Sequence, residues 1–494
     1  MKRLKTSLLE EIRQQTHKIT KRQIIGFVIA MALVLANGYA IIRETQVVPL
    51  ITVAAVGLYV LFFHADVAMF LIAFTTPLSI IISSKNIHLG LSLPSEGLMI
   101  ALTMIFFARI LYDLRINRAF LKHPISIAIM VYLGWMLITC LTSVRPVISL
   151  KFFASKLWFI TSCYWFFMQM VEDDLRNAVR YFNCYALGLT IIVCITTYLH
   201  ALSGFDEHYA HYVMSPFYND HTAYGAALAF MIPITAGFFF LPDNKLPQKI
   251  FYIVISLILL MAFYLSFSRA AWISLVVAVG VLIIIKLRIK LSWILGGGLV
   301  LGLLLFFYAD DILYKMSRNN QDSSGNFVEH IQSMSNISTD ASNMERINRW
   351  TAAFGMIQEK PIFGWGPGTY QFEYAPFQKG YYRTIISTDF GDGGNAHSEY
   401  IGPCAESGIP GMLSVFAIVF VFLIVGIKTY INTEDKTLKL LSLCMVISLI
   451  SYYTHGVFNN FLDTDKLSAI VWAAMAVITV CDVKTKTAVQ KPNL

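Results

Sequence analysis

A histidine stands where polar, glycine-rich sequence meets a long apolar run. The stretch is GGNAHSEYIGPCAESGIPG, and His397 is its one histidine. Asn395 is suited to cap a helix beginning at Ala396, which would put His397 in the first helical turn. The helix dipole there disfavours an imidazolium, and a neutral imidazole can act as a general base. His397 is therefore the candidate catalytic residue; the alternative is an interfacial histidine that bonds a loop carbonyl.

Three arginines are candidates for binding an anion. Arg269 interrupts an apolar stretch in YLSFSRAAW, where an arginine either clamps a phosphate through two hydrogen bonds or extends to the lipid headgroups. Arg346 and Arg349 lie three residues apart in SNMERINRWTAAFGMIQ, which we predict to be a helix; the alternative for this pair is a solvated helix face. The apolar face predicted for this helix comprises Met344, Ile347, Thr351, Phe354 and Ile357.

Residues 203–225 form a polar and aromatic segment between two apolar runs. Its side chains of metal-ligating type are Asp206, Glu207, His208, His211, Asp220 and His221. The spacing EHYAH differs from the HExxH of metalloproteases, so we predict no metal site. Aromatic faces and polar groups suit a sugar, and we assign His211, His221 and Tyr224 to contact with substrate.

Supporting roles are assigned to residues near His397 and to a turn-rich loop. Glu406 and Asn395 are expected to bond nearby backbone and position the histidine. In EKPIFGWGPGTY, Gly366 and Gly368 favour a turn; the alternative is a loop whose backbone N–H groups approach a ligand.

The composition is that of a membrane protein. The chain has 494 residues, 56% of them hydrophobic and 14% charged, far fewer charges than in a soluble domain. Apolar runs long enough to cross a bilayer lie near 24–42, 124–142, 181–202, 223–241, 409–427 and 438–457. Shorter or weaker candidates lie near 47–63, 66–82, 97–112, 152–171, 249–267, 270–285, 291–308 and 466–482. We therefore predict an all-α polytopic protein with roughly 12–14 transmembrane helices.

Charge sets the predicted orientation. The net charge is +8, and the basic residues cluster in segments that lie on one side of the membrane if the spans alternate in direction. The positive-inside rule makes that side cytoplasmic, and both termini are then cytoplasmic. The predicted organisation is a basic N-terminal segment (1–23), about eleven spans (24–308), a large, partly helical periplasmic loop with the active-site helices (309–408), three spans (409–483) and a cytoplasmic tail (484–494).

Several classes of chemistry lack their motifs in this sequence. It contains no P-loop and no GxGxxG fingerprint, and it has no CxxC pair among its seven cysteines. We expect no cofactor, no metal and no nucleic-acid partner. Since the polar groups gather at the outer ends of spans, a transporter or flippase, with ionisable groups near the membrane midplane, is the less favoured class.

Several stretches together resemble one family. ERINRWTAAFGMIQEKPIFGWGPGTY, followed by AHSEYIGPCAESGIPG and a span, resembles the shared region of the O-antigen ligase and O-antigen polymerase superfamily. SFSRAAW is similar to the Ser-Arg-Gly/Ala-x-Trp element of this family, and SPFYNDHTAYGAALAFMIPI and SVRPVISLKFF resemble two further elements. The resemblance covers most of the chain from about residue 120 onward.

The resemblance implies an enzyme of the bacterial inner membrane. Such enzymes transfer a glycan from undecaprenyl diphosphate to an acceptor at the periplasmic face, without a nucleotide sugar or an essential metal. His397 takes the position of the family's essential histidine, which deprotonates the acceptor hydroxyl, and Arg269 that of an arginine proposed to hold the diphosphate. Ligase onto lipid A–core is our first reading; the alternatives are a polymerase acting on a growing glycan and a protein O-oligosaccharyltransferase.

One family feature is missing. Ligases of this family often carry a further arginine near the loop that corresponds to 204–224, and here no arginine lies between Arg180 and Arg269. The candidate replacements are His208, His211, His221, Arg346, Arg349 and Lys156.

Overall fold

Helices make up most of the described protein. The structure is a computed structural model that describes residues 64–84, 89–113, 118–289, 341–383, 387 and 394–490. The chain divides into two compact units, Met1–Val67 and Ala68–Leu494, and only residues 64–67 of the first are described. The predicted segments 1–23, 24–42, 47–63 and 291–308 lie outside the described residues.

The described elements follow one another along the chain. Those before residue 203 are α4 (Ala65–Thr75), β1 (Ile80–Ser84), β2 (Leu89–Leu93), α5 (Ser95–Asp113), α6 (Arg118–Leu121), α7 (Pro124–Leu141), α8 (Pro146–Ile160), the π-helix η1 (Thr161–Phe166), α9 (Phe167–Asp173) and α10 (Arg176–Leu202). Those after it are α11 (Glu207–Ala210), α12 (His221–Phe238), α13 (Leu246–Leu265), α14 (Arg269–Lys286), α18 (Ala341–Glu359), α19 (Tyr370–Glu373), η2 (Ala375–Phe377), η3 (Gly380–Tyr382), α20 (Ile401–Asn432), α21 (Lys436–His455) and α22 (Asp465–Gln490).

Many of these helices are suited to a bilayer. Within the described part of the chain, 8 helices are long and apolar enough to cross a membrane. They are α5, α7, α10, α13, α14, α20, α21 and α22. The prediction of an all-α polytopic membrane protein is confirmed, and each of these helices overlaps a predicted span.

The predicted span at 66–82 is wrong. Helix α4 ends at Thr75 after 11 residues, which is only about 16 Å of rise. Pro77 explains the end, since the residue before a proline is disfavoured in the helical conformation. The chain then forms the antiparallel pair β1–β2, in which Ile80 lies opposite Leu93.

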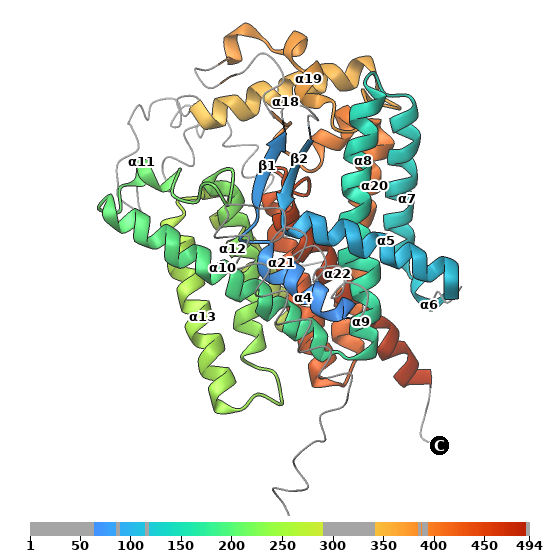
Figure 1. Cartoon of the computed structure of the whole chain (residues 1–494), viewed down its shortest axis with the longest axis vertical. Helices are drawn as coiled ribbons and strands as arrows, with labels where there is room; N and C mark the ends of the chain where they lie inside the picture. Colours follow the sequence, from blue (N-terminus) through green and yellow to red (C-terminus); the bar gives the residue numbers. More distant parts are fainter. Residues whose placement is uncertain are drawn as a thin grey trace, which may run out of the picture. The chain divides into compact units, whose positions relative to one another are not determined.

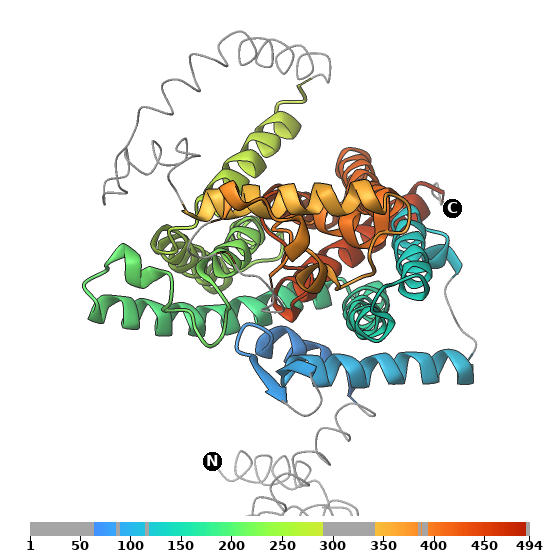
Figure 2. The ribbon, with the colours of Figure 1, turned by 90° about the horizontal axis from the view of Figure 1, so that it is seen from above.

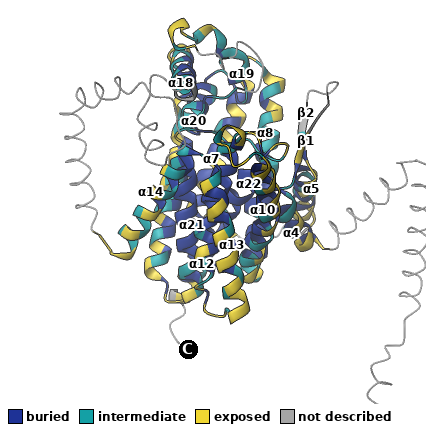
Figure 3. Ribbon diagram, turned by 90° about the vertical axis from the view of Figure 1, so that its left-hand side faces the viewer, coloured by how far each residue is buried: buried dark blue, intermediate teal, exposed yellow. Residues whose placement is uncertain are grey.

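Helices α21 and α22 form the centre of the unit Ala68–Leu494. The apolar window of α22 is 94% buried, against 22% for α14, and Figure 3 shows exposed residues along α13 and α14. Helix α21 packs against α12, α14, α20 and α22, while α22 also packs against α9 and η1. Small residues let neighbouring helices approach closely in a membrane, and α22 buries Ala469, Ala473, Ala474 and Ala476.

Helix α18 lies across the ends of the other helices, packed on α20 (Figures 1 and 2). The prediction of a helix here is confirmed, but the predicted apolar face is wrong, because Phe354 is 52% exposed. The buried stripe instead comprises Glu345, Asn348, Arg349, Ala352, Ala353 and Met356. These positions recur at helical spacing, so polar residues occupy half of the stripe that faces the rest of the protein.

Candidate active site

His397 lies in an irregular turn before α20. The side-chain oxygen of Asn395 accepts a hydrogen bond from the His397 backbone N–H at 2.9 Å, and the φ of His397 is 48°. Helix α20 begins only at Ile401, so the predicted helix start at Ala396 is wrong. The bond from the His397 N–H to the Asn395 side chain forms an Asx-turn, and it does not cap a helix. A left-handed histidine costs about 1–3 kcal/mol and persists only where its surroundings hold it.

Burial and positive neighbours keep the imidazole neutral. Burial lowers the pKa of His397 to about 4, and Arg346 and Arg349 add to this effect, while Asp220 and Glu345 oppose it. A buried site disfavours the charged ring, and nearby cations disfavour it further. The neutral form expected from the sequence thus has a different physical cause, since the dipole of a helix start is absent at this residue.

Glu399 fastens the histidine turn to the connection between α21 and α22. Its Oε1 accepts hydrogen bonds from the backbone N–H groups of Phe461 (2.8 Å) and Leu462 (2.9 Å) and from the hydroxyl of Tyr452. Its own N–H donates to the carbonyl of Gly456 at 2.8 Å. The sequence patterns did not reveal this role of Glu399. The available signal was the polar stretch HGVFNNFLDTDK between two apolar runs.

Arg346 and Arg349 reach the same turn from α18. Arg349 is 4% exposed, its Nε bonds Glu345 Oε1 at 2.6 Å, and its guanidinium lies 4.2 Å from the centre of the Tyr374 ring. A Cβ on Gly394 would lie 2.0 Å from Arg349 Nη1, so this guanidinium packs directly on the turn. Arg346 donates to the carbonyl of Phe458 at 3.3 Å. The solvated-face alternative therefore does not describe this pair.

Arg269 begins α14 after a sharp break. The sequence offered no turn residue there, but Phe267 takes a φ of 47° and separates α13 from α14. Ser268 is wholly buried, and a Cβ on Gly225 would come within 2.7 Å of it, so α12 and this break pack closely. Arg269 and Arg346 both lie within electrostatic reach of His221, which begins α12. The structure therefore brings the predicted arginines toward one end of the helices.

The polar segment 203–225 supplies helix caps and a histidine pair. Asp206 caps α11, and Asp220 caps α12 by accepting N–H bonds from Thr222 (2.8 Å) and Ala223 (2.7 Å). The rings of His211 and His221 stack, with centroids 4.1 Å apart. Among the described residues, no group of three or more His, Cys, Asp or Glu side chains is placed to hold a metal ion.

Comparison with known proteins finds a family model that covers this part of the chain. Residues 254–416 match the family model described as O-antigen ligase. This stretch contains Arg269, Arg346, Arg349 and His397. This match supports membership of the O-antigen ligase superfamily. The resemblance drawn from the sequence motifs is confirmed at that level.

A curated relative comes from Haemophilus influenzae. It is an uncharacterised protein that is 25% identical over 259 residues, which are 50% of this chain and 60% of the relative. The matched part of the chain thus spans about 60% of the length of that relative.

In this O-antigen ligase region, the GWGPG loop packs against the protein itself. Gly366 has a φ of 117°, its N–H donates to the Glu406 carbonyl at 2.7 Å, and a Cβ there would lie 1.9 Å from Ser143 Oγ. Glu406 Oε1 accepts the N–H of Tyr370 at 3.1 Å. Gly368 has a φ of 73°. The N–H groups of Trp365 and Gly366 are bonded to α20, which favours the turn-making role over ligand contact.

Two further candidate residues, Tyr224 and Lys156, are buried and bonded within the protein. Tyr224 is 3% exposed, and its hydroxyl is 3.1 Å from Thr196 Oγ1 in α10, so its phenol is held between helices. Lys156 is buried, and its Nζ donates to the Leu462 carbonyl (2.7 Å) and to Asp463 Oδ1 (3.0 Å). Lys156 thus bonds the connection between α21 and α22, and its candidacy as a replacement for the missing family arginine stays a prediction.

Proposed function

We propose that this protein transfers an oligosaccharide or polysaccharide from undecaprenyl diphosphate to an acceptor hydroxyl at the periplasmic face of the bacterial inner membrane. The observation that carries the proposal is a neutral His397 beside Arg346 and Arg349. Arg269 joins this group through its proximity to His221. A base next to fixed cations suits a reaction whose leaving group is a diphosphate.

In the proposed reaction, His397 accepts the proton of the acceptor hydroxyl while the oxygen attacks the anomeric carbon of the donor sugar. The bond between that carbon and the diphosphate oxygen breaks, and undecaprenyl diphosphate leaves with the bonding electron pair. The arginines stabilise the charge that develops on the diphosphate, most strongly in the transition state. The stacked His211 and His221 rings add a polar, aromatic surface beside the arginines.

Lipid A–core is the acceptor we propose first, which makes the protein an O-antigen ligase. The large outer loop followed by three spans favours this acceptor. A polymerase that extends a growing glycan, or a transferase acting on protein serine or threonine, would use the same donor chemistry. We propose that none of these reactions needs a metal ion.

Reconstitution tests the proposal. Purified protein in liposomes would receive an undecaprenyl-diphosphate-linked glycan and, in separate reactions with EDTA present, lipid A–core, a second donor molecule or an acceptor protein. We expect a glycan-bearing lipid A–core band. A band only in one of the other reactions would reassign the acceptor. The absence of product with all three acceptors, with and without divalent ions, would overturn the proposed function.

A further inference from the structure

The connection between α21 and α22 carries buried polar atoms that bond no other part of the described protein. His455, the last residue of α21, is 1% exposed, and neither of its ring nitrogens has a hydrogen-bond partner among the described residues. The same holds for Nδ2 of Asn459 and Oδ1 of Asn460. All four atoms fall within six residues of the chain.

This concentration is unusual for a folded protein. Buried polar groups are nearly always hydrogen-bonded, because leaving one unpaired sacrifices the bonds it would make to water. An apolar residue would fit at 455 at least as well, since the His455 ring packs against Phe461 with centroids 5.6 Å apart. The unpaired atoms are therefore available to hydrogen-bond a ligand.

The same connection lies directly against the His397 turn. The Gly456 carbonyl accepts the Glu399 N–H, and the Asn460 carbonyl accepts a bond from Asn395 Nδ2 at 3.4 Å. Phe458 accepts the bond from Arg346 described above. His455 itself lies within electrostatic reach of Asp220 and Arg346. A ligand at His397 would thus have the α21–α22 connection as a near neighbour.

The kind of atom available indicates the class of ligand. An imidazole that is neutral offers one donor and one acceptor, Asn459 offers a donor, and Asn460 offers an acceptor. A phosphate only accepts hydrogen bonds from such groups, so it would leave the acceptors unpaired. A sugar hydroxyl both donates and accepts, and a pyranose ring presents several hydroxyls side by side.

We propose that His455, Asn459 and Asn460 form a carbohydrate subsite that hydrogen-bonds the hydroxyls of one sugar ring beside His397. The subsite rests on the proposed function, because it takes the sugar from the donor or the acceptor glycan of that reaction. The three residues bind and orient the ring, and His397 remains the base.

The test replaces His455 by phenylalanine and by glutamine, and Asn459 by alanine, in the full-length protein in liposomes. Melting temperature and the KM for each of the two glycan substrates are measured for every variant. His455→Phe should keep or raise the melting temperature, because it removes two unpaired polar atoms from a site beside Phe461. The same variant should raise the KM for one glycan by roughly tenfold, the loss expected for a hydrogen bond to a substrate hydroxyl.

The other variants separate this role from a structural one. His455→Gln keeps a donor and an acceptor and should restore part of the affinity, while Asn459→Ala should raise the same KM independently. The matched control is His123→Phe, because His123 is also buried but its Nε2 bonds Asp482 at 3.1 Å. That control should lose stability and keep both KM values, the reverse of the pattern at residue 455.

Each outcome decides a separate point. A raised KM for the undecaprenyl-linked glycan assigns the subsite to the donor, and a raised KM for the other substrate assigns it to the acceptor. Wild-type transfer with unchanged KM values in His455→Phe and Asn459→Ala would overturn the subsite and leave the proposed function standing. Absence of transfer by the wild type would overturn both.

Discussion

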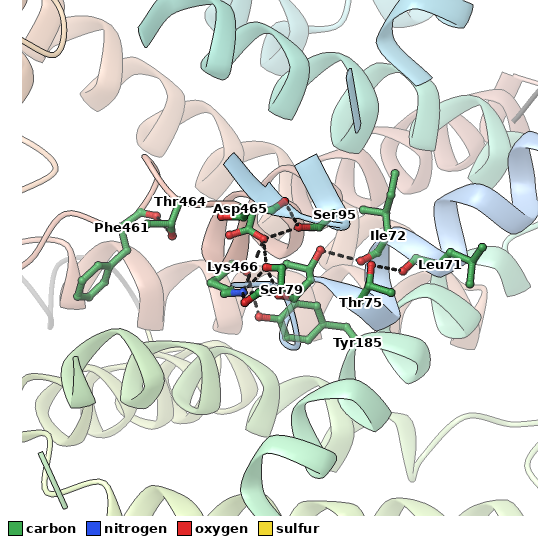
Figure 4. A network of polar contacts seen from close by, with 12 residues as sticks. Leu71, Ile72, Thr75, Ser79, Ser95, Tyr185, Phe461, Thr464, Asp465 and Lys466 are labelled. Carbon is green, nitrogen blue, oxygen red and sulfur yellow. Dashed lines mark hydrogen bonds and ion pairs between the residues drawn. The ribbon is translucent and has the colours of Figure 1, made fainter. Parts of the chain in front are cut away.

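Two neighbouring groups of polar residues in the α21–α22 region differ in whether their buried polar atoms have hydrogen-bond partners. At its distal end, Asp465 Oδ2 accepts bonds from Ser79 Oγ (2.5 Å) and Ser95 Oγ (2.6 Å), and Lys466 donates to the carbonyls of Thr76 and Ser79, both at 2.7 Å (Figure 4). We call these residues the anchor. At the near end, His455 and Asn459 are as deeply buried and Asn460 is partly buried, but each holds a buried polar atom with no partner in the described chain.

The contrast assigns a structural role to the anchor and a substrate-binding role to the near end. Every buried side-chain nitrogen or oxygen of Ser79, Ser95, Asp465 and Lys466 has a partner among the described residues, so the anchor stabilises one packing of α4 and α5 against α22. A buried charge pair contributes little net stability, but breaking it is costly. At the near end, polar atoms of His455, Asn459 and Asn460 lack partners within the described protein. This is expected of a surface that hydrogen-bonds a substrate.

The largest effect should come from His397 itself. His397→Ala removes the proposed base and should lower the rate of glycan transfer by about 10²–10⁴-fold, the usual contribution of a general base. The melting temperature should change little, because the bond to Asn395 comes from the backbone N–H of residue 397 and survives the substitution. A wild-type rate in the liposome assay would remove His397 from the mechanism.

Arg269→Lys tests whether the cation acts by geometry as well as charge. A lysine cannot form two parallel bonds to a phosphate, so we expect the rate to fall by roughly 10²-fold. Arg180→Lys is the matched control, since Arg180 is half exposed and pairs with Asp174 at 3.6 Å. If both variants turn over donor equally well, Arg269 serves only to reach the headgroups.

Asp465→Ala should affect stability and spare the chemistry. It leaves Lys466 and two buried serines without their acceptor, a change that costs about 3–5 kcal/mol when a buried pair is broken. We expect a lower melting temperature and a lower yield of folded protein, with the transfer rate per folded molecule near that of the wild type. A reduced rate without lost stability would erase the distinction between the anchor and the site.

The smallest effect concerns pH. Because burial and the arginines lower the pKa of His397 to about 4, the unprotonated base should persist well below neutrality and be lost as the pH falls through that value. The kcat/KM for donor should therefore stay nearly constant from about pH 8 to about pH 5.5. Half-loss of kcat/KM near pH 6.5, the value of an exposed histidine, would mean that the ring is not held as described.

The sequence predicted the elements better than their contacts. Long apolar runs specify membrane helices by length alone, so α7, α10, α20 and α21 were predictable, whereas Pro77 was overlooked within an apolar run and α4 was extended too far. On α18, apolar periodicity selected the wrong face, because the buried stripe carries Glu345, Asn348 and Arg349. A periodicity argument assumes that polar residues face water.

The site shows the same limit. His397 and the arginines were identified by residue type and by the family motifs. The role of the α21–α22 connection was missed, because its bonds to Glu399, Arg346 and Asn395 join residues far apart in the sequence. One-dimensional patterns carry no information about such pairings. The short polar stretch between two spans was the available sign that backbone there serves a site.

Hydrogen exchange on the wild-type protein, with and without an undecaprenyl-diphosphate-linked glycan, tests the central claim most directly. If the lipid-linked glycan binds beside His397, the amides of residues 394–400 and 455–461 should exchange more slowly with the ligand present. Residues 463–468, which contain Asp465 and Lys466 of the anchor, should exchange at the same rate in both samples. Unchanged exchange at 394–400 and 455–461 under saturating donor, or protection confined to the anchor, would contradict the account.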